Sequence, residues 1–190
     1  MHRKTLFSAL FLVVTVLVNV MGAIFAATNI IPLYLDSVLT IALTAYAGLF
    51  WGIGAAVLTN LCLHLLHITI LPYMVCHIST ALCAWLTFRH WDAKNIHGFN
   101  HQTNYPIEVF LLAGLWSALS NGILGNAVST LTPHIEKLSI ATPEQGLYIA
   151  TGSLLFSVYL TGLLTNLVDK LLSGFISFFV WRMLLGISKK

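Results

Sequence analysis

Long apolar tracts, separated by short polar segments, run through the whole chain. They are continuously apolar and do not alternate with a period of two residues, which predicts helices rather than the strands of a membrane barrel. The first tract, Thr5 to Ala27, is close to the roughly 20 residues that cross a bilayer as a helix. Arg3 and Lys4 precede this tract, so the bias of basic residues toward the cytoplasm predicts a cytoplasmic start.

Two shorter helices are expected after Pro32. They cover Leu35 to Leu49 and Ile53 to Leu71, and a tight turn from Gly48 to Gly54 joins them. Each is short for a full span. A fourth helix opens at Pro72 and runs to about Phe88, where four charged or titratable residues close it: Arg89, His90, Asp92 and Lys94.

Residues 92–106 form the long polar connection among the early spans, and four crossings from a cytoplasmic start return it to the cytoplasm. A fifth helix is expected from Ile107 to Leu131. It carries Gly114, Ala118 and Gly122 four residues apart, and such a stripe of small side chains lets another helix approach closely. Residues 132–146 then form an outer loop.

The last tract, residues 147–187, is interrupted only by Asn166, Asp169 and Lys170, and its length allows two spans. Seven crossings would place the final two lysines outside, against the orientation bias. We therefore expect a partial, re-entrant or strongly tilted helix over 147–166 and a final crossing over 171–187. The prediction is an all-α integral membrane protein, a compact bundle of about six transmembrane helices, with or without one extra partial or re-entrant helix. Residues 1–190 form a single transmembrane domain with both termini cytoplasmic.

The composition agrees with a membrane protein and excludes several other classes. Hydrophobic residues make up 58% of the chain and charged residues 8%, against roughly 25% charged in an ordinary soluble domain. The net charge of +3 is too small and scattered for nucleic-acid binding. A secretory signal peptide is the rival interpretation of the first tract, with Ala23 to Ala26 as a loose cleavage site, but further apolar tracts follow it. The tryptophans near predicted helix ends are typical of interfacial anchors: Trp51, Trp85, Trp91, Trp116 and Trp181.

Asp36 is a carboxylate where a helix is expected to begin near the outer interface. It could be a helix cap, with Ser37 sharing the free N–H groups, or it could mark a ligand or ion path, since an unpaired charge at membrane depth is costly. Asp169, beside Lys170, is either a local ion pair or interfacial anchor, or it joins Asp36 around one polar pocket toward the outer side. A pocket of this kind would suit a ligand with a positive or hydrogen-bond-donating group.

Histidine, cysteine and asparagine side chains in the apolar tracts raise further alternatives. His64 and His67 are three residues apart, and with His77 and Cys76 they could be a metal or haem site, or polar contacts between helices. The three cysteines form no CxxC pair and are expected to be buried thiols. We expect His97 and His101 to be solvated in their loop. The span asparagines must find partners and either pack helices together or line a solute cavity: Asn19, Asn60, Asn121 and Asn126.

Two stretches resemble the substrate-binding S components of energy-coupling factor (ECF) transporters. The run IPLYLDSVLTIALTAYAGLFWGIGAAVLTN, from Ile31 to Asn60, is similar to their second and third helices. The run LLTNLVDKLLSGFISFFVWRML, from Leu163 to Leu184, is similar to the entry into their final helix. A basic start that leads into a first helix with small residues, from Lys4 to Ala9, is also similar.

The resemblance implies a membrane-embedded subunit that captures a vitamin or metal from outside, while a separate membrane-embedded ECF coupling subunit and two ATPases drive its release inside. Thr5 and Ala9 would contact that partner. The metal branch of the family starts with Met-His, as here, but Arg3 and Lys4 follow, so a small organic micronutrient such as a vitamin is preferred over a metal. From the polar side chains themselves, we expect the substrate to be bound by Tyr34, Asp36, Asn60, Asn121, Asn166 and Asp169.

The chain carries no nucleotide loop, no Ser/His/Asp order and no paired carboxylates at glycosidase-like positions, so we expect neither an enzyme nor a cofactor. The expected location is a cell membrane, with the bacterial cytoplasmic membrane favoured. Two alternatives stay open: a ligand-binding membrane sensor or assembly module that moves nothing, and a haem or metal membrane protein.

Overall fold

The protein is an all-α bundle. The computed structural model describes residues 2–29, 33–94, 105–131 and 151–188, and these residues contain helices and no strands. Its elements are α1 (His2–Thr28), α2 (Thr40–Ala47), α3 (Leu49–Leu65), the short 3-10 helix η1 (Leu71–Tyr73), α4 (Met74–Lys94), α5 (Ile107–Leu131) and α7 (Leu154–Ser188). Four of them, α1, α4, α5 and α7, are long and apolar enough to cross a membrane. The prediction of an all-α, multi-pass membrane protein is confirmed.

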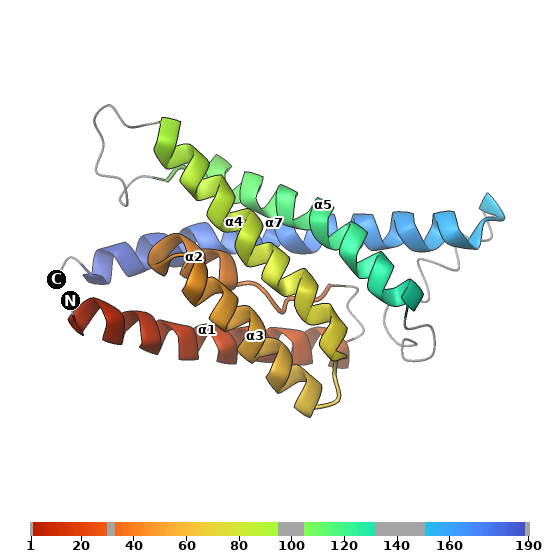
Figure 1. Cartoon of the computed structure of the whole chain (residues 1–190), viewed down its shortest axis with the longest axis horizontal. Coiled ribbons are helices and arrows are strands. Elements are labelled where there is room, and N and C mark those ends of the chain that lie inside the picture. The colour runs from red at the N-terminus through yellow and green to blue at the C-terminus, as the bar shows by residue number, and fades with distance from the viewer. Residues whose placement is uncertain (1, 30–32, 95–104, 132–150, 189–190) are drawn as a thin grey trace.

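Successive helices alternate in direction along the long axis of the molecule. Helices α1, α3 and α5 run away from the end where the chain starts, and α2, α4 and α7 run back, so that the first turn of α1 and the last turn of α7 lie at the same end (Figure 1). Aromatic contacts agree, because Tyr46 near the end of α2 packs against Phe7 and Phe11 near the start of α1. Both ends of the described chain therefore lie on one side, as expected, and the assignment of that side to the cytoplasm stays a prediction.

The region between α1 and α4 differs from the expectation in where its helices begin and end. Helix α2 starts at Thr40 rather than Leu35, and residues 33–39 are not helical. Gly48, with a φ of 94°, makes the turn from α2 to α3 alone, and Gly52 and Gly54 lie inside α3. A left-handed φ of this kind suits a residue without a Cβ. Helices α2 and α3 are short, as predicted.

The last tract forms one helix where a partial helix over 147–166 and a separate crossing over 171–187 were expected. Helix α7 is continuous for 35 residues from Leu154 to Ser188, and Asp169 and Lys170 lie in its middle. The predicted break was wrong because these two charged side chains have partners inside the bundle, so the helix does not need to end there. The predicted outer loop over 132–146, like His97 and His101, lies outside the described residues.

Close packing between α5 and α7 depends on small residues, as the stripe on α5 predicted. A Cβ on Gly114 would collide with the backbone carbonyl oxygen of Lys170, and a Cβ on Gly122 would come within 2.9 Å of the Leu163 side chain. On the other helix, a Cβ on Gly174 would reach 2.5 Å from the carbonyl oxygen of Phe110. Because these glycines have no side chains, the backbone of α7 at Lys170 can approach α5 closely.

An aromatic cluster packs toward the end of the bundle where α1 begins and α7 ends. Phe88, Phe110 and Trp181 surround Tyr105, with ring centroids 4.9 to 6.4 Å apart. The Tyr105 hydroxyl donates to Asp92 Oδ2 at 2.8 Å, and burial together with this carboxylate raises the pKa of the hydroxyl. Trp181 is 2% exposed, so the interfacial-anchor interpretation is wrong for this tryptophan. Trp116 is exposed but lies well inside α5, so its role as an anchor stays a prediction.

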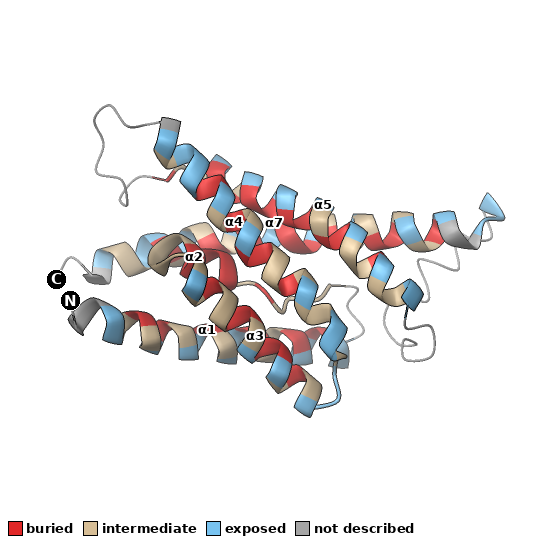
Figure 2. Ribbon diagram, in the orientation of Figure 1, coloured by how far each residue is buried: buried red, intermediate tan, exposed pale blue. Residues whose placement is uncertain are grey.

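Besides this apolar core, many polar side chains lie inside the bundle, and many apolar side chains face outward. Along α1 a buried stripe that includes Ser8, Thr15 and Asn19 faces the other helices, while leucines and valines such as Leu6 and Leu17 are exposed (Figure 2). A soluble protein would show the reverse. The surrounding lipid accepts the apolar outer surface, and every polar group inside must find its partners within the protein.

Candidate functional site

Residues 33–39 form an irregular segment of bends and a turn between two helices that do not meet. In the described part of the chain α1 and α7 do not pack against each other, and this segment fills the space between them (Figure 1). It lies close to α1, since a Cβ on Gly22 would come within 2.6 Å of the Leu35 carbonyl oxygen. Leu35 has a φ of 48°, a conformation that non-glycine residues rarely adopt. Irregular backbone at membrane depth is tolerated only where protein covers it, as here.

Side chains of α1 and α7 form hydrogen bonds with the backbone groups of this segment. Asp169 Oδ1 on α7 accepts the Leu35 N–H at 2.9 Å, and Asn19 Oδ1 on α1 accepts the Leu39 N–H at 3.0 Å. Ser177 on α7 donates its hydroxyl to the carbonyl of Val38 at 2.6 Å. The segment is therefore held in place by side chains where a helix would use its own backbone hydrogen bonds.

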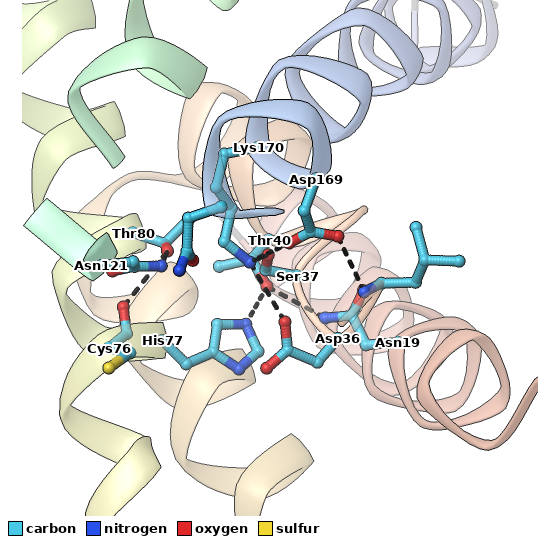
Figure 3. Close-up of polar contacts among 12 residues, drawn as sticks. Asn19, Asp36, Ser37, Thr40, Cys76, His77, Thr80, Asn121, Asp169 and Lys170 are labelled. Atoms are coloured by element: carbon cyan, nitrogen blue, oxygen red, sulfur yellow. Dashed lines mark hydrogen bonds and ion pairs between the residues drawn. The ribbon is translucent and has the colours of Figure 1, made fainter. Parts of the chain in front are cut away.

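Lys170 stands at the centre of a charged cluster beside this segment. From α7 its Nζ points toward the segment and donates to Asp169 Oδ2 at 2.6 Å, to Ser37 Oγ at 2.6 Å and to Asp36 Oδ1 at 3.2 Å (Figure 3). The Lys170 and Asp169 side chains are 3% and 0% exposed, whereas the Asp36 side chain is 22% exposed. The three hydrogens of the ammonium group are thus matched by three acceptors.

The cluster does not balance its own charge. Two carboxylates and one ammonium, −1 −1 +1, leave a net charge of −1. Both oxygens of Asp169 are occupied, by the Leu35 N–H and by Lys170. Asp36 uses Oδ1 for Lys170, and its Oδ2 has no hydrogen-bond partner on another described residue. The carboxylate oxygen of the cluster without a partner on another described residue therefore belongs to Asp36, its most exposed member.

The structure tests two interpretations of these acids, a helix cap for Asp36 and an ion pair or interfacial anchor for Asp169. Asp36 is not a helix cap: α2 begins at Thr40, its N-cap is Leu39, and no side chain caps it. The Asp36 carboxylate instead pairs with Lys170, which lies 134 residues later in the sequence. Asp169 does form the local ion pair with Lys170, but it is fully buried and so is not an interfacial anchor. Asp36 and Asp169 lie in one cluster through their shared contact with Lys170, and the predicted ligand pocket around them stays a prediction.

A second chain of hydrogen bonds links side chains of four helices, α1, α2, α4 and α3. Asn19 Nδ2 on α1 donates to Thr40 Oγ1 on α2 at 3.0 Å, and Thr40 Oγ1 lies 2.7 Å from His77 Nε2 on α4. His77 Nδ1 lies 2.8 Å from Asn60 Nδ2 on α3. The Thr40 backbone N–H, donating to the Ser37 carbonyl at 3.1 Å, joins this chain to the charged cluster.

The geometry assigns the tautomer of His77. Asn60 Nδ2 also donates to the Ala56 carbonyl at 2.8 Å, which fixes that atom as the amide nitrogen. Because Nδ2 is a donor, His77 Nδ1 must accept, and the imidazole is neutral with its proton on Nε2. His77 therefore donates to Thr40 and serves as a polar contact between helices, one of the two roles considered for it.

Five buried side-chain oxygens have no hydrogen-bond partner among the described residues: Thr15 Oγ1, Thr59 Oγ1, Asn60 Oδ1, Asn121 Oδ1 and Ser173 Oγ. Two of them belong to candidate binding residues. Asn121 Nδ2 donates to Thr80 Oγ1 at 2.9 Å across the interface between α5 and α4, while its oxygen accepts nothing. An unsatisfied buried acceptor costs about 1–3 kcal/mol, so each of these two oxygens would gain from a hydrogen-bond donor placed beside it.

The other candidates divide between this region and simple helix packing. Asn166, one turn before Lys170 on α7, is buried and donates to the Gly162 carbonyl of its own helix at 2.8 Å. Tyr34 is half-buried in the same segment as Asp36. Asn126 joins α5 to α7 by donating to the Tyr159 carbonyl at 3.3 Å. Thr5 is exposed and Ala9 half-buried near the start of α1, far along that helix from Asn19.

His64 and His67 do not share a helix face, because α3 ends at Leu65. His67 has a φ of 57° and follows the helix end, where its N–H bonds to the His64 carbonyl at 3.0 Å and the Ile68 N–H to the Leu63 carbonyl at 2.9 Å. This pattern is a Schellman motif with histidine where glycine is usual. His64 Nδ1 lies 3.3 Å from the Thr69 carbonyl. Both histidines therefore help end a helix.

Within the described ranges, no three His, Cys, Asp or Glu side chains come together as a metal site requires. Cys62, Cys76 and Cys83 are free and only half-buried, less enclosed than expected. Ser37, Thr40 and Ser177 carry contacts at the site that the sequence did not assign to it. Hydroxyls recurring at buried positions of apolar tracts were the available signal, but short hydroxyl side chains usually bond within their own helix.

No protein-family model, curated protein or solved structure matches this chain. What the protein does is therefore inferred from its own residues and their geometry.

Proposed function

We propose that this protein is the high-affinity solute-binding subunit of an ECF-type uptake transporter for a small organic micronutrient such as a vitamin. Asp36 binds a positive or hydrogen-bond-donating group of the solute, and Asn60, Asn121, Asn166 and Tyr34 add uncharged contacts. The protein itself is not an enzyme and needs no cofactor. In this proposal it resides in the bacterial cytoplasmic membrane.

The observation that carries the proposal is the Asp36 carboxylate, which belongs to a buried charged cluster and whose Oδ2 has no hydrogen-bond partner on another described residue. A charged group at membrane depth costs about 2.5–3.5 kcal/mol on insertion scales unless something compensates it. Lys170 compensates one oxygen at 3.2 Å, and the cluster keeps a net negative charge. A carboxylate that purely stabilised the fold would be expected to have both oxygens matched, as Asp169 has.

The rigidity of the surroundings also supports a binding role. Asp36 lies in a segment whose backbone is held at Leu35, Val38 and Leu39 by side chains of α1 and α7. Binding sites work best when the groups that meet the ligand are held in position before it arrives. Two buried amide oxygens, Asn60 Oδ1 and Asn121 Oδ1, have no hydrogen-bond partner among the described residues. Together these groups suit a ligand that donates several hydrogen bonds.

The resemblance to S components suggests how captured solute is released. A membrane-embedded coupling subunit and two ATPases would act on this chain, with Thr5 and Ala9 in the contact. The exposed apolar surface of α1, which includes Leu6, Leu10 and Val13, would face either lipid or that subunit. A membrane sensor that binds the same solute without moving it is the second candidate, and only its partners distinguish it.

The test is binding of the solute that co-purifies with the protein, identified by mass spectrometry, to wild type and to Asp36→Asn. Losing one charge-assisted hydrogen bond should weaken binding by about 1.5–3 kcal/mol, which is tenfold or more. Glu108→Gln is the matched control, because Glu108 is an exposed carboxylate at the start of α5. If folded Asp36→Asn stays within about twofold of wild type, Asp36 does not bind the solute.

Co-purification separates the two candidate functions. A transporter subunit should bring down an ATPase pair and a large membrane protein, and Thr5→Trp together with Ala9→Trp should disrupt that association without changing solute affinity. A signalling partner in their place would favour the sensor.

A further inference from the structure

The three hydrogen bonds that the Lys170 ammonium group donates differ in length. The contacts to Asp169 Oδ2 and Ser37 Oγ are both 2.6 Å, whereas the contact to Asp36 Oδ1 is 3.2 Å. Shorter hydrogen bonds between charged groups are the stronger ones. Lys170 is therefore held mainly by Asp169 and Ser37, and its hold on Asp36 is the weakest of the three.

Asp36 is also the member of the cluster that a ligand can reach. Its side chain is 22% exposed, against 3% for Lys170 and 0% for Asp169. A cationic group that approaches Asp36 meets a carboxylate already facing another cation. Lys170 therefore already offsets part of the negative charge with which Asp36 would attract a cationic ligand.

We propose that Lys170 is a built-in counter-ion that a ligand's ammonium or other N–H group displaces from Asp36, so that Lys170 sets the affinity and selectivity of this site for cations. This inference rests on the proposed role of Asp36 in binding. When the ligand arrives, Lys170 keeps its two short contacts, to Asp169 and Ser37, and gives up only the long one. The exchange leaves no buried charge without a partner, which is the condition for a charged group to stay buried at low cost.

The exchange also explains a preference for certain ligands. Lys170 already contacts Asp36 Oδ1, so a ligand binds only if it interacts with Asp36 better than this tethered ammonium does. A cation with N–H donors can take up Asp36 Oδ2 as well as replace Lys170 at Oδ1. A cation of similar size without such donors offers charge alone and gains little over Lys170.

The test removes the competitor while keeping the charge of the cluster constant. The double variant Asp169→Asn/Lys170→Met leaves Asp36 alone, and its net charge of −1 equals that of the wild type. An asparagine at 169 keeps an oxygen that can accept the Leu35 N–H. The probe is methylammonium chloride, with tetramethylammonium chloride as the cation that lacks donors, and binding is measured from the rise in unfolding temperature in detergent at fixed chloride concentration.

We expect methylammonium to bind the double variant at least about tenfold more tightly than wild type, the lower end of what one charge-assisted hydrogen bond is worth. Tetramethylammonium should show no comparable gain. Equal or weaker methylammonium binding by the folded double variant would overturn the inference, even if Asp36→Asn still abolished the binding and so upheld the site. No response of any variant to methylammonium, or an unchanged response in Asp36→Asn, would remove Asp36 from cation binding and this inference with it.

Lys170→Arg provides a measurement that does not depend on the double variant folding. A guanidinium group keeps the positive charge and presents a planar fork that can hold both carboxylates firmly. The arginine should compete more strongly than lysine for Asp36 and so weaken methylammonium binding by at least about threefold. Unchanged binding by folded Lys170→Arg would show that the group at position 170 does not compete for Asp36.

Discussion

Replacing Lys170 by methionine should be one of the most destabilising single changes available in this protein. Methionine has a similar length and no charge, so the substitution removes the cation and leaves the space filled. Three contacts disappear at once, two of them at 2.6 Å. Asp36 and Asp169 are then left side by side with two negative charges and no positive one.

The magnitude follows from burial. Removing one partner of a buried ion pair costs about 3–5 kcal/mol, because the remaining charge is left without compensation. Asp169, at 0% exposure, cannot recover this loss from water, although it still accepts the Leu35 N–H. Asp36, at 22% exposure, recovers part of it. We therefore expect about 3–4 kcal/mol, against the 0–1 kcal/mol typical of an exposed salt bridge.

Unfolding in mixed micelles, followed by tryptophan fluorescence as the fraction of denaturing detergent rises, measures this difference. Arg182→Met is the matched control, because Arg182 is an exposed basic residue on the same helix whose guanidinium lies 5.6 Å from the Phe178 ring, and its loss should cost at most about 1 kcal/mol. Adding Asp169→Asn to Lys170→Met should restore most of the lost stability. A cost for Lys170→Met no larger than that of Arg182→Met would refute the idea that this lysine neutralises buried charge.

Two further predictions concern regions away from the cluster. Gly114→Ala should destabilise the protein by about 1–3 kcal/mol, since its Cβ meets backbone at Lys170, whereas Gly186→Ala, with nothing within 4 Å of the new atom, should be neutral or stabilising by about 0.5–1 kcal/mol; thermal unfolding of both variants checks the difference in sign. For Tyr105, burial raises the pKa of the hydroxyl above its ordinary value of 10.0, so its contribution is intact below about pH 10 and is lost as the pH rises further, because the unfolded chain ionises first. Tyr105→Phe should make unfolding less sensitive to pH above 10, and an identical pH profile for both proteins would contradict this.

The hydropathy of the sequence was enough to predict the class of fold and most of the long helices. Ile107 to Leu131 was expected as a helix and is one, with the same bounds. The small residues on this helix also predicted its close neighbour correctly, because the distance between two helices depends on the side chains at their contact. Such features are local, and a single tract contains all the information needed to infer them.

Predictions failed where a local pattern depended on a distant partner. Asp169 and Lys170 suggested the end of a span because a charge in an apolar tract is normally costly, yet their partners at Leu35, Asp36 and Ser37 allow α7 to continue through them. Likewise, nothing near Asp36 in the sequence indicates that its counter-ion lies 134 residues later. His67 was placed on a helix face because a histidine gives no sign that it will adopt the left-handed conformation of a helix cap.

The break between α1 and α2 and the charged cluster depend on one another. Residues 33–39 can lie at membrane depth without helical hydrogen bonds only because Asn19, Asp169 and Ser177 satisfy their backbone groups. Asp169 can be buried only because Lys170 neutralises it, and Lys170 is shared with Asp36 on the same segment. Since the groups that hold the segment also surround Asp36, most substitutions here will change stability and binding together. The role of Asp36 is therefore best tested by changes that keep the charge or the shape of the cluster constant, because only these separate a binding group from a structural one.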